Sequence, residues 1–384
     1  MPRVRSFRAQ VAAIVVGAVA LRVVYVLVLA REVTAAGDSN FFHGTANLVA
    51  DGHGFVEPFL YGKGIDVPTA AHPPLYPLLL SVVSWFGGTS WHAHRVFGCF
   101  LGGITIVLIA LIARRLGGDR AGVIAAAIAA VYPVLVATDG ALMSEGLYTV
   151  LFAAILYVAL VFWDRRDLRL GALLGVLIGL TALTRSEALA MLPLLAWPLA
   201  LALEGRRRRI ALVAVSSVAC LAVLAPWVIR NTSAFHTPTF ISNNDSTVLA
   251  GANCPEAYNG PDIGQWRFDC ISERTTLNEA KQAKIWRREG IDYIGHHAGR
   301  LAVVIPVRLL RTWDLYQPRR QVMFAEGRAP WAYKLGVVAY FLLMPLAIAG
   351  AAGWLAVSLV GEHALDHATA VSKDRKATPA ALAQ

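Results

Sequence analysis

The chain has 384 residues, of which 57% are apolar or aromatic and only 16% are charged. Soluble globular proteins carry about 25% charged residues, so the composition excludes an ordinary cytosolic enzyme, a secreted domain and a disordered tail. The net charge of +10 does not indicate nucleic-acid binding. Its Lys and Arg residues lie largely in short runs at the ends of apolar blocks, as membrane topology requires.

The long apolar blocks predict an all-α polytopic membrane protein with a bundle of about eight transmembrane helices. The expected spans are 10–30, 95–113, 121–138, 147–163, 170–183, 188–203, 210–229 and 333–360. Block 10–30 is long for a signal peptide, so we expect a retained first helix. Two further apolar blocks, 75–86 and 301–310, are near or below the roughly 17–20 residues that a span needs.

The basic runs fix the expected topology. If block 75–86 lies on the outer face as a juxtamembrane helix, the runs at 114–120, 165–169, 206–209 and 373–376 all fall on the cytoplasmic side. This distribution satisfies the positive-inside rule. We therefore expect a multi-pass protein of the inner membrane with both termini in the cytoplasm.

This topology divides the chain into six parts. They are an N-terminus with the first helix (1–30), a first outer loop with juxtamembrane helices (31–94), core helices (95–230), a small α-helical or irregular outer region (231–330), a last helix (331–360) and a cytoplasmic tail (361–384). Cys99 and Cys220 lie in apolar helices, where packing explains them. Cys254 and Cys270 lie in the outer region, where we expect a disulfide, with zinc binding as the alternative.

Asp38 and His72 are the first candidates for chemistry. Asp38 follows the first helix, where a carboxylate suits a general base that acts on a hydroxyl beside the membrane; it can equally cap a helix at 41–50. His72 precedes two prolines in AHPPLYP. It can contact a phosphate through its N–H groups, or be a surface residue beside a turn.

Other polar residues of the outer turns can have either a functional or a structural role. Asp139 and Glu145 flank a turn between spans and can share a pocket with Asp38 or cap a helix. Arg185 and Glu187 form a similar pair. An Arg on the outer side is an exception to the positive-inside rule.

Three further features involve basic residues. Arg22 lies within the first span and can either snorkel to the interface or face a polar cavity. Arg308 and Arg311 share a helical face and can bind a phospholipid-like anion or lipid headgroups. The pair His92 and His94 lacks the partners of a metal site.

The chain has no P-loop, no dinucleotide motif and no nucleotide-binding domain. A substrate processed at the outer face must therefore arrive activated, most plausibly on a lipid carrier.

Six segments occur in the order and topology of a known family. They are GDSNFFHGTANLVADGHGF, HPPLYPLLL, LIARRLGGDRAGVIAAAIAAVYP, SEGLYTVLF, GLTALTRSEALAMLP and APWVIRN. Over roughly residues 3–231 the chain resembles the GT-C glycosyltransferases of the protein O-mannosyltransferase and lipid A aminoarabinose transferase type (glycosyltransferase family 39-like). These polytopic enzymes move a sugar from a polyprenyl phosphate to an acceptor on the outer membrane face.

The resemblance implies roles for several residues. Asp38 matches the acid that acts as catalytic base or positions the acceptor, while Ser39 stands where many relatives have a second acid, which weakens the case for a bound metal. His72 matches a basic position near the donor phosphate. Asp139, or alternatively Glu145, matches a second acid. Arg185 and Glu187 match a turn with a structural or donor-side role.

The chain has fewer spans and a smaller outer region than many relatives, so no role is transferred beyond residue 231. We expect an inverting transferase that uses a polyprenyl-phosphate sugar and a glycan, lipid or protein acceptor of the cell envelope. The predicted donor-phosphate ligands are His72, Lys63, Arg308 and Arg311, and a divalent cation is an optional cofactor. The alternatives are a transporter or flippase of lipid-linked sugars and a non-catalytic partner in envelope assembly.

Overall fold

The computed structural model describes residues 6–33, 37–321 and 327–377. These residues form helices joined by turns, and the described part holds no strand beyond an isolated bridge between Val56 and Pro68. The predicted all-α polytopic membrane fold is thus confirmed. Five helical stretches of this part are long and apolar enough to cross a membrane: α1 with the π-helical turn that ends it (Phe7–Leu29), α5 (Trp91–Val131), α7 (Glu145–Arg165), α9 (Arg206–Phe235) and the first part of α15 (Pro330–Gly353).

Element α5 contains two helices that reverse direction at a pair of glycines. Gly117 and Gly118 have φ values of −141° and 80°, and the positive value favours glycine. A Cβ on Gly122 would lie 2.7 Å from the carbonyl oxygen of Ala110, so the two halves pack closely. The expected spans 95–113 and 121–138 are therefore both present, the second ending in α6 (Pro133–Asp139).

Two other expected spans are short or irregular. Helix α8 (Leu168–Ala182) has 15 residues. The segment Ser186–Ala202 is a chain of 3₁₀ and π-helical turns, because Pro193 and Pro198 lack the N–H that a regular helix needs. All eight expected blocks are helical, but only some are long, regular helices.

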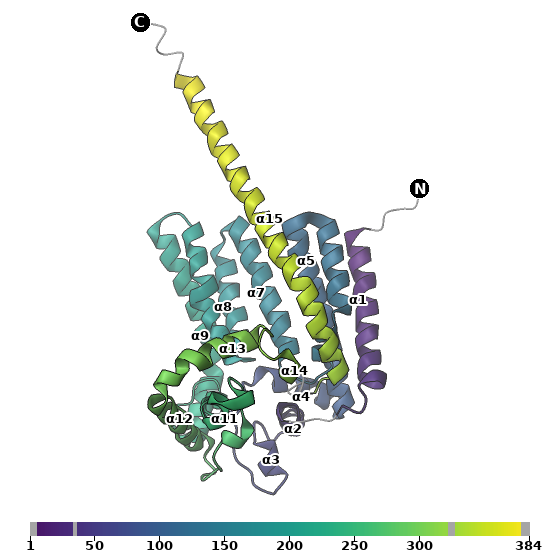
Figure 1. Ribbon diagram of the computed structural model, residues 1–384, viewed down its shortest axis with the longest axis vertical. Coiled ribbons are helices and arrows are strands. Elements are labelled where there is room, and N and C mark those ends of the chain that lie inside the picture. Colours follow the sequence, from purple (N-terminus) through teal and green to yellow (C-terminus); the bar gives the residue numbers. More distant parts are fainter. Residues whose placement is uncertain (1–5, 34–36, 322–326, 378–384) are drawn as a thin grey trace. The chain divides into compact units, whose positions relative to one another are not determined.

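The chain divides into two units, Met1–Tyr333 and Lys334–Gln384. Within the first unit, α1 packs on α5, α5 on α7, α7 on α8 and α8 on α9 (Figure 1). The close approach of α8 and α9 depends on small residues, since a Cβ on Gly175 would lie 2.1 Å from the carbonyl oxygen of Ser216. The second unit continues α15, which runs from Pro330 to Ala377.

Further helices, most of them short, gather at one end of this bundle (Figure 1). They are α2 (Asp38–Ala50), α3 (Pro58–Tyr61), α4 (Leu75–Trp85), α10 (Asn244–Ala252), α11 (Pro255–Tyr258), α12 (Glu279–His296), α13 (Leu301–Thr312) and α14 (Pro318–Gln321). Helix α4 spans only about 16 Å and packs on α2, as expected for a helix that does not cross. Helix α10 packs on α12, which brings the later part of the chain to the same end.

Candidate active site

Asp38 is the first residue of α2. Gly37 precedes it with a φ of 53°, a left-handed conformation that favours glycine. The partial positive charge at a helix N-terminus stabilises a carboxylate in the first turn. The Asp38 side chain is 45% exposed, so the helix start presents an accessible carboxylate.

His72 lies beside this carboxylate and is held by aromatic rings. Its Nε2 is 3.4 Å from Asp38 Oδ1, and its ring centroid lies 4.8 Å from that of Phe41 and 5.0 Å from that of Phe42. Burial alone would raise the pKa of Asp38, but its interactions with His72 and the charge of Arg185 together hold that pKa below the ordinary value. Asp38 is therefore an ionised hydrogen-bond acceptor at neutral pH.

Two cavities meet at Asp38 and His72. One has a volume of about 770 Å³ and the other about 580 Å³, and Asp38, His72 and Asn244 border both. Both volumes lie in the range of small-molecule sites. Ligands in the two cavities can thus reach the same carboxylate.

The larger cavity, which we term the polar cavity, is bordered by three basic side chains. Arg185 lies 2.6 Å from Glu187 and 3.3 Å from Glu145. Lys284 and Arg287 come from α12, and Arg287 pairs with Asp245 at 2.8 Å. For Lys284 the described residues offer no ion-pair partner. These cations suit a phosphate group, which Lys and Arg bind through charge-assisted hydrogen bonds.

The smaller cavity, which we term the aromatic cavity, has a different wall. Five aromatic side chains border it. Phe41 comes from α2, Phe59 from α3 and Trp286 from α12, while Trp266 and Phe268 lie in the segment between α11 and α12. The two compartments beside Asp38 therefore differ in chemistry.

Asp139, the second predicted catalytic acid, lies away from both cavities. It is 5% exposed and pairs with the fully buried Arg22 at 2.7 Å. Arg22 also donates to the carbonyl oxygens of Ala18 and Ala130. Of the two readings of Arg22, the structure supports an internal polar site rather than snorkelling, and the pair ties α1 to α6.

Glu145 lies near the polar cavity. It contacts Arg185 and, at 3.7 Å, Arg328, and Arg328 also donates to Thr138 Oγ1. Glu145 and Arg185 thus connect the wall of the polar cavity to the segment that precedes α15. Glu187 borders the polar cavity directly.

Three of the four predicted phosphate ligands are not brought to Asp38. Lys63 is exposed in the turn after α3. Arg308 donates to Ala252 O, and Arg311 donates to Ile263 O at 2.7 Å. Both arginines thus hold the backbone around the disulfide loop. Only His72 lies at the site.

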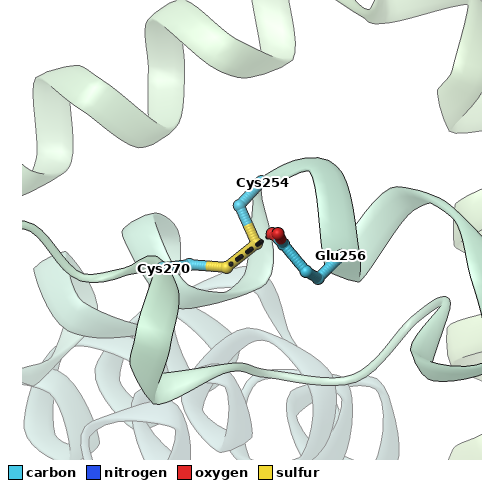
Figure 2. Close-up of side chains that lie close together, drawn as sticks. All are labelled: Cys254, Glu256 and Cys270. Atoms are coloured by element: carbon cyan, nitrogen blue, oxygen red, sulfur yellow. Dashed lines mark hydrogen bonds between the residues drawn. A yellow bond between two sulfur atoms is a disulfide. The ribbon is translucent and has the colours of Figure 1, made fainter.

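Cys254 and Cys270 are joined by a disulfide, as Figure 2 shows. With Glu256 they form the one group of three potential metal ligands within 4.8 Å among the described residues. Both sulfurs are bonded to each other, so they offer no thiolate to zinc. Asp38 belongs to no such group within the described ranges.

Several residues at the site carried no recognisable signal in the sequence. Lys284 and Arg287 are three apart on α12, a spacing that puts both on one helical face, but nothing in the sequence connects that face to Asp38. Trp266 and Trp286 lie in the same part of the chain. All four come from the part of the chain beyond residue 231, to which the resemblance transferred no residue roles.

Comparison with known proteins gives one match, which covers the middle of the chain. No curated protein and no solved structure is significantly similar to the chain. Residues 71–229, from the position before His72 to the last turns of α9, match the model of the dolichyl-phosphate-mannose-protein mannosyltransferase family. Asp38 and α10–α13 lie outside the matched range. The match confirms, over residues 71–229, the resemblance to the protein O-mannosyltransferase family inferred from the motifs.

Proposed function

We propose that the protein is a membrane glycosyltransferase that moves a sugar from a polyprenyl-phosphate donor to a hydroxyl of a cell-envelope acceptor. The family match supports a glycosyltransferase in general terms. The observation that carries the finer proposal is the position of Asp38, an ionised carboxylate where a cation-lined cavity meets an aromatic one.

The chemistry follows from this position. Asp38 accepts the proton of the acceptor hydroxyl while that oxygen attacks the anomeric carbon of the donor. The bond between that carbon and the phosphate oxygen breaks, and the polyprenyl phosphate leaves with the bonding electron pair. Attack opposite the leaving group inverts the anomeric configuration.

The departing phosphate requires electrostatic stabilisation more than protonation, because it already carries charge. We assign this task to Lys284 and Arg185 in the polar cavity. His72 contacts Asp38 and orients its carboxylate. The basic runs at the opposite ends of the spans favour a site on the extracytoplasmic face of the inner membrane.

The test is complementation of a deletion strain with wild-type protein, Asp38→Asn and a matched control. Asp51→Asn is the control, because Asp51 is an exposed residue at the other end of α2. Loss of a general base lowers rates by about 10²–10⁴-fold. We expect one polyprenyl-phosphate sugar to accumulate in lipid extracts of the deletion and Asp38→Asn strains, and not with Asp51→Asn.

Full complementation by Asp38→Asn would overturn the assignment of the base. Movement of a lipid-linked sugar between leaflets of proteoliposomes, without any acceptor and unaffected by Asp38→Asn, would instead identify a transporter. Mass spectrometry of the accumulated lipid would name the donor sugar.

A further inference from the structure

The aromatic cavity has rigid, solvent-accessible rings. Phe268 is 73% exposed, Phe59 49% and Trp266 40%, although these are large apolar side chains. The rings of Trp266 and Phe268 lie 6.2 Å apart at an angle of 59°. Clusters of exposed apolar groups beside a cavity mark binding surfaces.

The two tryptophans are fixed with their polar edges already satisfied. Trp266 Nε1 donates to Thr247 O and Trp286 Nε1 donates to Ser272 O, both at 2.9 Å. A Cβ on Gly251 would lie 2.4 Å from Trp266 Nε1, so this glycine makes room for the indole. Since the N–H groups are occupied, the rings offer a ligand their faces rather than hydrogen bonds.

Polar side chains interrupt the aromatic wall. Glu57, Arg274 and Gln282 border the same cavity. Gln282 is fully buried, and its Oε1 accepts hydrogen bonds from Thr275. Its Nε2 has no partner among the described residues. A ligand that fits this wall combines apolar faces with hydrogen-bonding groups.

We propose that the aromatic cavity binds a neutral saccharide, which is the acceptor of the transfer; this inference rests on the proposed function. The C–H faces of a sugar ring pack on the electron-rich faces of aromatic rings, and its hydroxyls pair with the interspersed polar groups. Because Asp38 borders this cavity, a hydroxyl of the bound saccharide reaches the base.

Other occupants fit less well. A prenyl chain would have to cover Glu57, Arg274 and Gln282 with hydrocarbon, which costs free energy when polar groups lose water without gaining partners. A peptide that docks in an aromatic-lined groove is typically proline-rich, and its prolines would offer few hydrogen-bonding groups to Glu57, Arg274 and Gln282. The donor's charged phosphate finds its cations in the polar cavity.

The test is isothermal titration calorimetry of the full-length protein in nanodiscs. The probes are linear mannotetraose, an arabinan-derived tetrasaccharide, a threonine-rich peptide and a polyprenyl phosphate. We expect a tetrasaccharide to bind, and Trp266→Leu and Phe268→Ala each to weaken its affinity by about tenfold. Trp85→Leu and Phe86→Ala are matched controls, because these rings, at the end of α4 and directly after it, are 78% and 85% exposed and border neither cavity. They should bind like wild type.

The outcomes separate this inference from the proposed function. Tetrasaccharide binding that survives Asp38→Asn, while that variant loses transfer, supports both. If polyprenyl phosphate binds but neither tetrasaccharide does at millimolar concentration, or if only the peptide binds, the saccharide assignment is overturned and the transferase stands. Unchanged affinity in both aromatic variants overturns it as well. If Asp38→Asn retains transfer activity, only the assignment of Asp38 as the base is contradicted.

Discussion

Glu279 accepts a hydrogen bond of 2.6 Å from Thr69 Oγ1, although the two residues are 210 positions apart in the sequence. Its other oxygen accepts from the backbone N–H of Ala70 and from Asn243 Nδ2. His72 follows Ala70 by two residues. The first residue of α12 thus anchors the segment that presents His72 to Asp38.

Glu279 is therefore a positioning residue, and its loss should affect turnover more than donor affinity. We expect Glu279→Ala to lower kcat by about 10- to 100-fold, since small displacements of reacting groups have effects of this size. Glu279→Gln keeps one acceptor oxygen and should recover part of the loss. Steady-state kinetics would check this, with Asp292→Ala on an exposed part of α12 as control. Equal effects of the two alanine variants would contradict the positioning role.

The pH dependence of transfer should depend on His72. In the wild type, burial raises the pKa of Asp38, but His72 and Arg185 lower it more, so the carboxylate stays ionised to a lower pH than that of an ordinary Asp. In His72→Ala, less opposes the effect of burial, and the pKa of Asp38 rises. The acidic limb of kcat against pH should therefore move to higher pH. An acidic limb that stays in place, in a variant that still folds and turns over, would show that His72 does not control Asp38.

The sequence predicted the fold class, and that prediction had a local cause. Apolar blocks of span length predict helices wherever they occur. Asp38 and His72 were singled out by the motifs of the family that the chain resembles. The structure places His72 Nε2 3.4 Å from Asp38 Oδ1, and their roles stay predictions. The irregular turns between Ser186 and Ala202 also have a local cause, the prolines Pro193 and Pro198. The sequence nevertheless predicted an ordinary span there, because the block is apolar throughout.

The remaining features depend on contacts between distant residues. The burial of Asp139 follows from its pairing with Arg22, 117 positions away, and no local pattern distinguishes such an acid from an exposed one. Lys284 and Glu279 reach the site only because α12 packs on α10. Arg308 and Arg311 form a basic pair on one helical face, yet backbone carbonyls of the neighbouring loop occupy their guanidinium groups.

The pair Arg22 and Asp139 should stabilise the fold rather than serve catalysis. Arg22→Met leaves a buried carboxylate without its partner, which costs about 3–5 kcal/mol, so the melting temperature in detergent should fall clearly. Arg8→Met, at an exposed position of the same helix, should not change it. The double variant Arg22→Met, Asp139→Leu should recover stability and transfer activity together. A stable but inactive double variant would instead restore Asp139 to the catalytic machinery.

The disulfide should stabilise the aromatic cavity as well as the fold around it. Cys254 and Cys270 enclose a loop of 16 positions, for which the chain-entropy model gives about 3 kcal/mol, and Trp266 lies within that loop. We expect the variant with both cysteines changed to serine to melt at a lower temperature and to bind tetrasaccharide more weakly, while the polar cavity still binds polyprenyl phosphate. Dithiothreitol should reproduce both effects in the wild type and add nothing in the double variant. Weaker binding of both ligands would mean that the bridge supports the whole end of the bundle, and unchanged saccharide affinity would show that the loop keeps its shape without it.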